Sequence, residues 1–475
     1  MTSPRGIQCS RLFSLQNLLF FERLDYIGEI NSRNSGRGSM KRALLAGLCI
    51  ACGMTTTAHA TNGLFLIGAG NTARGMGGVG IATPLDSLSA YANPAAIAGM
   101  SKRMDVGIDL FVPISEARLG SVTAKSENDE FGITNVYPMP SFGYVFGSHG
   151  RFTFGIHAAP AGGGASYYKT NFFQAAASGV SDPNVDPTLR DPLGVNLLAF
   201  QVNPTLAWRS ADGVNAVGAS LVTAIARFSA YGIGLFDPFT PTQGSIKDFS
   251  DQGQDWSAGA GLRLGWLGHY GDWKLGLSYT SRVDMMNFRE YEELFAESGD
   301  LDLPPMLGIG FSYQITPRLL LAMDLSQTYY EQIRAISNRG PNLAGQNSLD
   351  DPEGQKLGRK EGLGFGWRNQ TVSKIGLQYR YSDQWTLRAG WNYGKSPINE
   401  DREIIFNLLA PATTQNHLTL GATWRLAAGK DLNFSWVHAF EHEQAGPTYV
   451  SDDGSNYGSM KMHQNAFGLS FSVKY

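Results

Sequence analysis

The sequence predicts an all-β protein, a transmembrane antiparallel β-barrel of about 14 strands. Polar and apolar residues alternate with a period of two along most of the chain after Arg103, as in strands with one apolar face. The connections alternate between short turns and long polar loops, which is typical of outer-membrane barrels. Mean hydropathy is −0.17 and no apolar run reaches about 18 residues, which excludes a helical membrane protein.

The first 60 residues differ from the rest of the chain. Residues 1–39 carry scattered arginines and a polar run, and we expect either a start codon assigned too far upstream or a disordered leader. Residues 40–60 have the basic start, apolar run and small-x-small end of a signal peptide, with cleavage after Ala60. The apolar run is shorter than the about 20 residues of a spanning helix, which argues against a membrane anchor. Because Cys9, Cys49 and Cys52 precede Ala60, the expected mature chain has no disulfides.

Residues 61–102 are rich in glycine and alanine and carry few charges. Such a segment buries too little apolar area to fold alone. A barrel of this size has a lumen too wide for wall side chains to fill. We therefore expect residues 61–102 to form a plug inside the lumen, called the hatch below. The hatch residues singled out are Gly75, Gly77 and Gly80, expected to give a close-packed plug backbone, and Asn93, Pro94 and Ala95.

Residues 103–475 form the expected barrel. An even number of strands places the start and the end of the barrel chain on the same side, the short-turn, periplasmic one. The apolar faces carry Trp and Tyr near strand ends, where the interface girdles of membrane barrels lie. A formal net charge of −3 argues against a nucleic-acid partner. The expected strands are 103–119, 137–148, 151–160, 196–210, 213–235, 255–268, 272–287, 303–316, 317–333, 370–383, 384–397, 414–427, 429–446 and 461–475.

Three stretches carry a resemblance to a known family. They are ARGMGGVGIA…LDSLSAYANPAAI in the hatch, Leu303-Pro304-Pro305-Met306, and the late hairpin NQTVSKIGLQYRYSDQWTLRAGWNYGKSPI. Over residues 61–475 the chain resembles the FadL family of outer-membrane long-chain fatty-acid and hydrocarbon transporters. The resemblance implies a monomer among Gram-negative outer-membrane lipids that passes hydrophobic small molecules passively. It also implies capture by an external apolar groove, and Tyr475 fits the aromatic end used by the barrel assembly machinery.

The family's cargo leaves sideways through a wall opening made by a kinked third strand. Here the third strand, residues 151–160, ends at Pro160 and is followed by Gly162, Gly163 and Gly164. Proline cannot donate to a ladder and glycines weaken a strand, so we expect pairing to fail at this point. An ordinary strand end followed by a flexible loop is the alternative.

Basic residues on polar strand faces are candidate cargo ligands. A carboxylate removed from water needs a cationic partner. The alternative is that these cations pair with acids such as Asp86 and hold the plug. Gly232 stands where the resemblance places a basic residue in the fifth strand, which leaves uncharged hydrocarbons open as cargo. The candidates are Arg74 in the hatch and Arg227, Arg263, Lys374 and Arg388 in the wall; Arg380 also falls on a polar face.

Two motifs point to other chemistry and are set aside. Residues 75–80 spell G-x-G-x-x-G but lack the strand, helix and acidic residue of a dinucleotide site. His438 and His442 belong to an H-x-x-E-H pattern, but on a strand such positions lie about 13 Å apart. We therefore expect no cofactor, no metal and no catalytic residues. A transport channel for hydrophobic molecules is favoured over a barrel lipid hydrolase, which needs a Ser–His pair, and over a porin with an open lumen.

Overall fold

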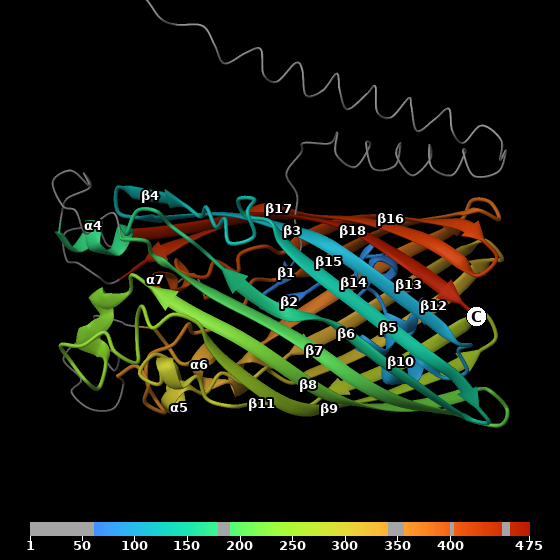
Figure 1. The fold of residues 1–475 in the computed structure, drawn as a ribbon. Helices are drawn as coiled ribbons and strands as arrows, with labels where there is room; N and C mark the ends of the chain where they lie inside the picture. The colour runs from blue at the N-terminus through green and yellow to red at the C-terminus, as the bar shows by residue number, and fades with distance from the viewer. Residues whose placement is uncertain (1–60, 179–190, 341–355, 400–402, 449–456) are drawn as a thin grey trace, which may run out of the picture. The chain divides into compact units, whose positions relative to one another are not determined.

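The computed structural model describes residues 61–178, 191–340, 356–399, 403–448 and 457–475. The leader and signal peptide expected within residues 1–60 lie outside this part of the chain. Among the described residues, fourteen antiparallel strands form a closed ring, which confirms the predicted barrel (Figure 1). The ring closes where the last strand pairs with the first, from Lys474 opposite Arg103 to Gly458 opposite Leu119. No helix in the described ranges is both long and apolar enough to cross a membrane.

Every ring strand pairs with its neighbours in sequence, apart from the closing pair, so the topology is a simple meander. Two short strands add to it: β4 (Val122–Lys125) pairs with β3, and β11 (Asp284–Met285) pairs with β9. The ring strands are β3 (Arg103–Leu119), β5 (Tyr137–His149), β6 (Phe152–Ala165), β7 (Gly194–Arg209), β8 (Asn215–Tyr231), β9 (Asp255–Tyr270), β10 (Trp273–Thr280), β12 (Met306–Thr316), β13 (Leu319–Thr328), β14 (Gln370–Arg380), β15 (Trp385–Gly394), β16 (Asn416–Ala427), β17 (Lys430–Pro447) and β18 (Tyr457–Lys474).

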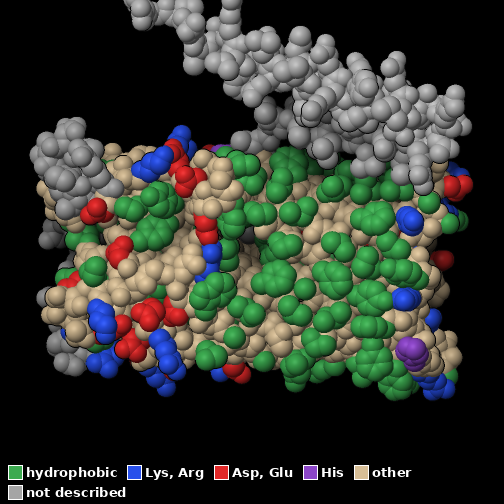
Figure 2. Space-filling model, in the orientation of Figure 1, with side chains coloured by type: hydrophobic (Ala, Val, Ile, Leu, Met, Phe, Trp, Pro, Cys, Tyr) green, Lys and Arg blue, Asp and Glu red, His purple; other side chains and the backbone are tan. Residues whose placement is uncertain are grey.

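The outer face of the ring is apolar because alternate residues of each strand point away from the lumen. Leu262 and Leu264 of β9, for example, are about half exposed, whereas Arg263 between them is buried. Figure 2 shows these apolar side chains as a band over the strands, with charged side chains gathered toward the long-loop end. Near the short turns, Trp385 and Trp424 stack with ring centroids 5.7 Å apart, as expected of an interface girdle.

The long loops carry short helices and lie at one end of the ring, opposite the C-terminus (Figure 1). They pack on buried aromatic side chains, among them Phe228, Phe236 and Phe288, rather than standing open in solvent. The helical segments are α4 (Phe172–Ser178), η4 (Gly234–Phe239), η5 (Arg289–Tyr291), α5 (Ala296–Gly299), η6 (Tyr330–Gln332), α6 (Arg334–Ser337) and α7 (Ile404–Asn407).

The hatch lies inside the ring, as predicted. It comprises the hairpin β1 (Thr61–Asn62) and β2 (Phe65–Leu66), then α3 (Asn71–Arg74), η1 (Ser87–Tyr91) and η2 (Pro94–Ile97). Helix α3 contacts β16, β17 and β18, while η2 contacts β7, β8 and β9, so the hatch touches opposite parts of the wall. Glycines allow this approach: a Cβ on Gly75 would come within 2.8 Å of the Gly421 Cα on β16.

Candidate functional site

A cavity of about 100 Å³ lies between the hatch and the wall, and we call it the chamber. Most of its lining is apolar, which suits a hydrophobic ligand. The Leu303-Pro304-Pro305-Met306 block contributes Leu303, Pro304 and Met306 to the wall side. The other apolar lining residues include Phe65, Leu66, Ile67, Val79, Ile81 and Leu88 from the hatch and Val283 and Leu307 from the wall.

One guanidinium in the chamber lacks a full set of partners. Arg263 on β9 is buried, and its Nε donates to Thr280 Oγ1 at 2.8 Å. The guanidinium carbon lies 4.8 Å from the centre of the Tyr91 ring, a cation–π contact. Its Nη1 has no hydrogen-bond partner within the described part of the chain. The chamber therefore combines an apolar lining with a buried cation that has an unused donor.

The other two charges in the chamber are bound to the hatch. Asp324 on β13 and Lys374 on β14 lie opposite each other in the ladder. Lys374 Nζ donates to the carbonyls of Ile67 at 2.9 Å and Gly78 at 3.3 Å. Asp324 Oδ2 accepts from the amides of Gly80 at 2.7 Å and Ile81 at 3.1 Å. These two side chains therefore position the hatch backbone.

The remaining predicted cations lie elsewhere. Arg74 forms a buried ion pair with Asp109 at 2.8 Å and does not line the chamber. Arg388 lines a different, polar cavity. Arg227 shares a face of β8 with the outward-pointing Ile225 and pairs with the loop residue Glu130 at 2.5 Å. Of the five candidates, the structure brings together Arg263 and Lys374.

The predicted hatch residues are points of contact with the wall. Gly77 has φ of 73°, its amide donates to Thr419 Oγ1 at 2.7 Å, and its carbonyl accepts from Asn392 Nδ2 at 3.2 Å. Asn93 accepts from the Ala95 amide at 3.0 Å and so caps η2, which begins at Pro94. Asn93 Nδ2 also donates to the carbonyls of Ile81 and Trp266, which joins two hatch segments to the wall.

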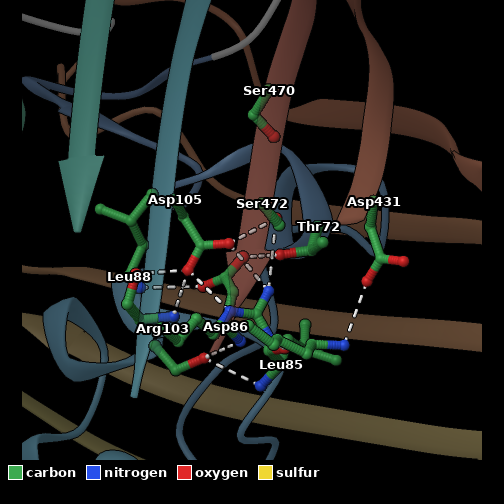
Figure 3. A network of polar contacts seen from close by, with 12 residues as sticks. Thr72, Leu85, Asp86, Leu88, Arg103, Asp105, Asp431, Ser470 and Ser472 are labelled. Carbon is green, nitrogen blue, oxygen red and sulfur yellow. Dashed lines mark hydrogen bonds and ion pairs between the residues drawn. The ribbon is translucent and has the colours of Figure 1, made fainter. Parts of the chain in front are cut away.

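A polar network binds the hatch to the seam, the ladder between β18 and β3 (Figure 3). Arg103 makes a bidentate pair with Asp105, at 2.7 and 2.8 Å, and also donates to the Leu85 carbonyl at 3.2 Å. Asp105 accepts from the Ser87 amide at 3.0 Å and from Ser472 of β18. The hatch is thus bonded to the first strand directly and to the last strand through Asp105.

Substitution of Asp105 by Asn is expected to destabilise the protein by about 3 kcal/mol, because it leaves the largely buried Arg103 without its carboxylate. Guanidinium unfolding followed by tryptophan fluorescence measures the loss. Bursts of ion current in planar bilayers are expected too, as the hatch undocks. Asp272→Asn, in the exposed β9–β10 turn, is the control and should change neither quantity. Equal behaviour of the two variants would show that this network does not hold the hatch.

The third ring strand has one unpaired edge. β6 pairs with β7 along its whole length through Ala165, with a register shift between Pro160 and Gly162. On its other side it pairs with β5 only from Phe152 to Ala158. The expected loss of pairing at Pro160–Gly164 therefore occurs on the β5 side alone. β5 itself carries Pro138 and Pro140 in this part, and proline in a strand is a sequence signal for an edge without a ladder partner.

The hatch hairpin occupies part of this unpaired edge. The Gly163 amide donates to the Leu64 carbonyl at 3.0 Å, and Phe65 lies opposite Gly162 as a ladder partner. The Leu64 amide in turn donates to the hydroxyl of Tyr330 at 3.0 Å. Phe65 also lines the chamber, so the chamber and the unpaired edge of β6 meet at this hairpin.

Two loop carboxyls adjoin the chamber wall at Leu303. Burial and the nearby charge of Asp302 raise the pKa of Asp300 to about 6. Asp302 accepts from the Met285 amide at 2.6 Å and pairs with Arg282 at 3.1 Å. The raised pKa means that Asp300 binds its proton more tightly in the folded protein than in the unfolded chain. Protonated Asp300 therefore contributes to the stability of the fold at low pH. That contribution is lost as pH rises through about 6.

Comparison with known proteins agrees with this architecture. Residues 50–475 match the family described as outer membrane protein transport protein (OMPP1/FadL/TodX). A comparison with individual curated proteins finds no matching sequence.

Three solved structures illustrate the likeness in fold. The Pseudomonas putida toluene transporter TodX has a TM-score of 0.61 at 16% identity, with 86% of this chain and 99% of that chain covered. The Ralstonia pickettii toluene transporter TbuX gives 0.59 at 19% identity over 86% and 99%. A Pseudomonas aeruginosa FadL homologue gives 0.60 at 16% identity over 87% and 99%.

Proposed function

Because the chain belongs to the OMPP1/FadL/TodX family of outer membrane transport proteins, we propose that it carries amphiphiles with one anionic head group, such as long-chain fatty acids. The family's proteins transport hydrophobic small molecules across the outer membrane and are not enzymes. The anionic head group is supported by one observation, the unused donor of buried Arg263 in an apolar chamber.

The chamber's chemistry suits the two ends of such a molecule. A carboxylate supplies the charged acceptor that the Arg263 guanidinium lacks, and such charge-assisted bonds are strong out of water. The apolar lining takes the alkyl chain, whose burial contributes about 0.8 kcal/mol per CH₂. An engineered cavity of about 150 Å³ takes benzene. The chamber, at about 100 Å³, is smaller, so the cargo must displace part of the hatch as it enters.

We propose that cargo moves passively and leaves through the wall at the unpaired edge of β6. An alkyl chain released into the periplasm loses the free energy of its buried CH₂ groups, whereas one released into the membrane keeps it. The β1–β2 hairpin lies between the chamber and this edge, through Phe65 and Leu64. Movement of this hairpin would connect the two.

The C-terminal strand is the proposed contact for the barrel assembly machinery. Tyr475 is exposed, its amide donates to the Lys102 carbonyl at 3.0 Å, and the Lys102 ammonium lies 4.8 Å from its ring. The aromatic terminus is therefore presented at the short-turn end, where a periplasmic partner can reach it.

Substitution of Arg263 by Gln tests the head-group assignment. Removing a charge-assisted hydrogen bond is expected to weaken binding of a fluorescent fatty acid by about ten-fold or more. Toluene uptake into proteoliposomes should be unchanged, because toluene has no head group. Arg209→Gln, at the exposed end of β7, is the charge-matched control and should leave both measurements unaltered.

An outcome in which Arg263→Gln binds the fatty acid as tightly as the parent would contradict an anionic cargo. Undiminished toluene uptake together with that result would favour uncharged aromatic hydrocarbons such as toluene, which TodX and TbuX transport. Loss of transport for both compounds, in a folded variant, would instead assign Arg263 to the structure of the chamber.

A further inference from the structure

A second cavity, of about 320 Å³, lies at the short-turn end of the lumen. The hatch forms one of its walls through Thr72, Pro84 and Leu85, and the inner faces of the ring form the others. Its lining shares no residue with the chamber, so the hatch separates the two spaces. We call this cavity the vestibule.

The vestibule has a large excess of positive charge. Asp431 is the one acidic residue among its described lining residues, and it already pairs with Arg425 at 3.4 Å and Lys474 at 3.0 Å. A third cation, Arg103, is bound to Asp105. Three further arginines, Arg318, Arg380 and Arg388, form no ion pair with any residue that the structure describes.

These three arginines line the vestibule from β14, β15 and the β12–β13 turn. Arg388 on β15 stands opposite Gln378 on β14, two ladder positions from the Arg380–Thr386 pair and on the same face. The Arg380 amide donates to the Arg318 carbonyl at 2.8 Å, which fixes the β12–β13 turn beside β14. Arg388 is held by Gln378 at 2.8 Å and Thr423 at 2.6 Å, both neutral. A concave, low-dielectric wall around unpaired cations focuses their field on the space between them.

We propose that the vestibule binds a small phosphate-bearing anion from the periplasmic side. Guanidinium groups match the oxyanion geometry of phosphate and bind it through paired hydrogen bonds. At about 30 Å³ of liquid per water, the cavity has room for about ten waters, enough for a phosphate or diphosphate group. Hydrophobic cargo does not fit this lining, because Leu85 and Leu320 are its main apolar side chains. A bound anion would touch the hatch wall and favour its docked position.

Isothermal titration of the mature protein in detergent micelles with sodium diphosphate tests the proposal. The expected result is saturable binding that weakens as salt rises, because Arg318 and Arg380 are exposed and salt screens exposed charges. The triple variant Arg318→Gln/Arg380→Gln/Arg388→Gln should bind about 100-fold more weakly or worse. Arg289→Gln/Arg359→Gln/Lys360→Gln removes equal charge at the long-loop end and should bind within about two-fold of the parent.

Heat-modifiable migration on gels shows whether each variant is folded. If the triple variant does not fold, binding is measured on the single variants Arg380→Gln and Arg388→Lys instead. Arg380→Gln should weaken binding, and Arg388→Lys should weaken it less. Two outcomes would overturn the proposal: no saturable heat from the parent, or an equal loss in both triple variants, which would show attraction by net charge alone. Competition by phosphatidylglycerol in nanodiscs would identify a lipid headgroup as the source of the phosphate. If phosphatidylglycerol does not compete, the ligand is a free anion.

Discussion

Deletion of residues 61–95 is expected to turn a closed barrel into an open ion channel. The fourteen ring strands begin at Arg103 and hydrogen-bond to one another, so the ladder does not depend on the hatch. Buried wall charges such as Asp324 and Lys374 would lose their hatch partners but gain water in the emptied lumen, which limits the loss of stability. Planar-bilayer recording should show a large steady conductance in place of a near-silent parent.

A silent deletion variant that is folded, as judged by heat-modifiable migration, would show that something other than the hatch closes the lumen. The deletion of residues 341–350, which lie between α6 and β14 in the sequence and do not belong to the hatch, is the matched control and should leave the parent's conductance unchanged. The same result bears on the porin alternative, because a general porin needs an open lumen. A near-silent parent and a conducting deletion variant would together argue against a porin.

Replacement of Gly164 by Trp is expected to reduce uptake of a hydrophobic tracer to near background. Gly164 lies on β6 where the β5 side is unpaired, and a Cβ there would meet no atom within 4 Å. A large side chain can therefore fill the space without disturbing the strand. Its neighbours cannot be used in this way, because a Cβ on Gly162 would lie 2.2 Å from the Leu64 carbonyl oxygen.

A size series makes this test quantitative. Uptake should fall from Gly164→Ala through Gly164→Leu to Gly164→Trp, because the obstruction grows while the backbone stays the same. Ser373→Trp places the same side chain on the lipid-facing side of β14, away from the edge, and should transport like the parent. If Gly164→Trp is folded and transports normally, cargo leaves by another route, and displacement of the hatch into the periplasm becomes the better account.

The sequence predicted the strands well because a membrane barrel has strict alternation. β3 runs from Arg103 to Leu119, as predicted, since Gly120 then turns with φ of 57°. The end of β6 differs: the prediction stopped at Pro160, but the strand continues to Ala165. A proline removes one donor, and the register shift against β7 absorbs it. Which edge of a strand loses its partner depends on its neighbours and cannot be read from the strand alone.

The site was harder to predict than the fold. Arg227 was expected on the lumen face, but near the long loops both faces of β8 are apolar, because inward-facing residues such as Phe228 pack under the loops. Alternation therefore does not reveal which face is inside. Arg263 and Arg388 look alike in sequence, yet one lies in the chamber and the other in the vestibule. Whether a cation has a partner depends on strand register and on the path of the hatch.

The seam between β18 and β3 sets the order in which this chain can fold. The hydrogen bond from Ser472 to Asp105 joins residues 367 positions apart, so it must wait for the final strand. Contacts of such long sequence separation slow folding. Until they form, β3 and β17 expose unpaired edges that can pair with other chains. Because Ser87 and Leu85 bind the same Asp105–Arg103 pair, the docking site of the hatch is complete only when β18 joins the ring.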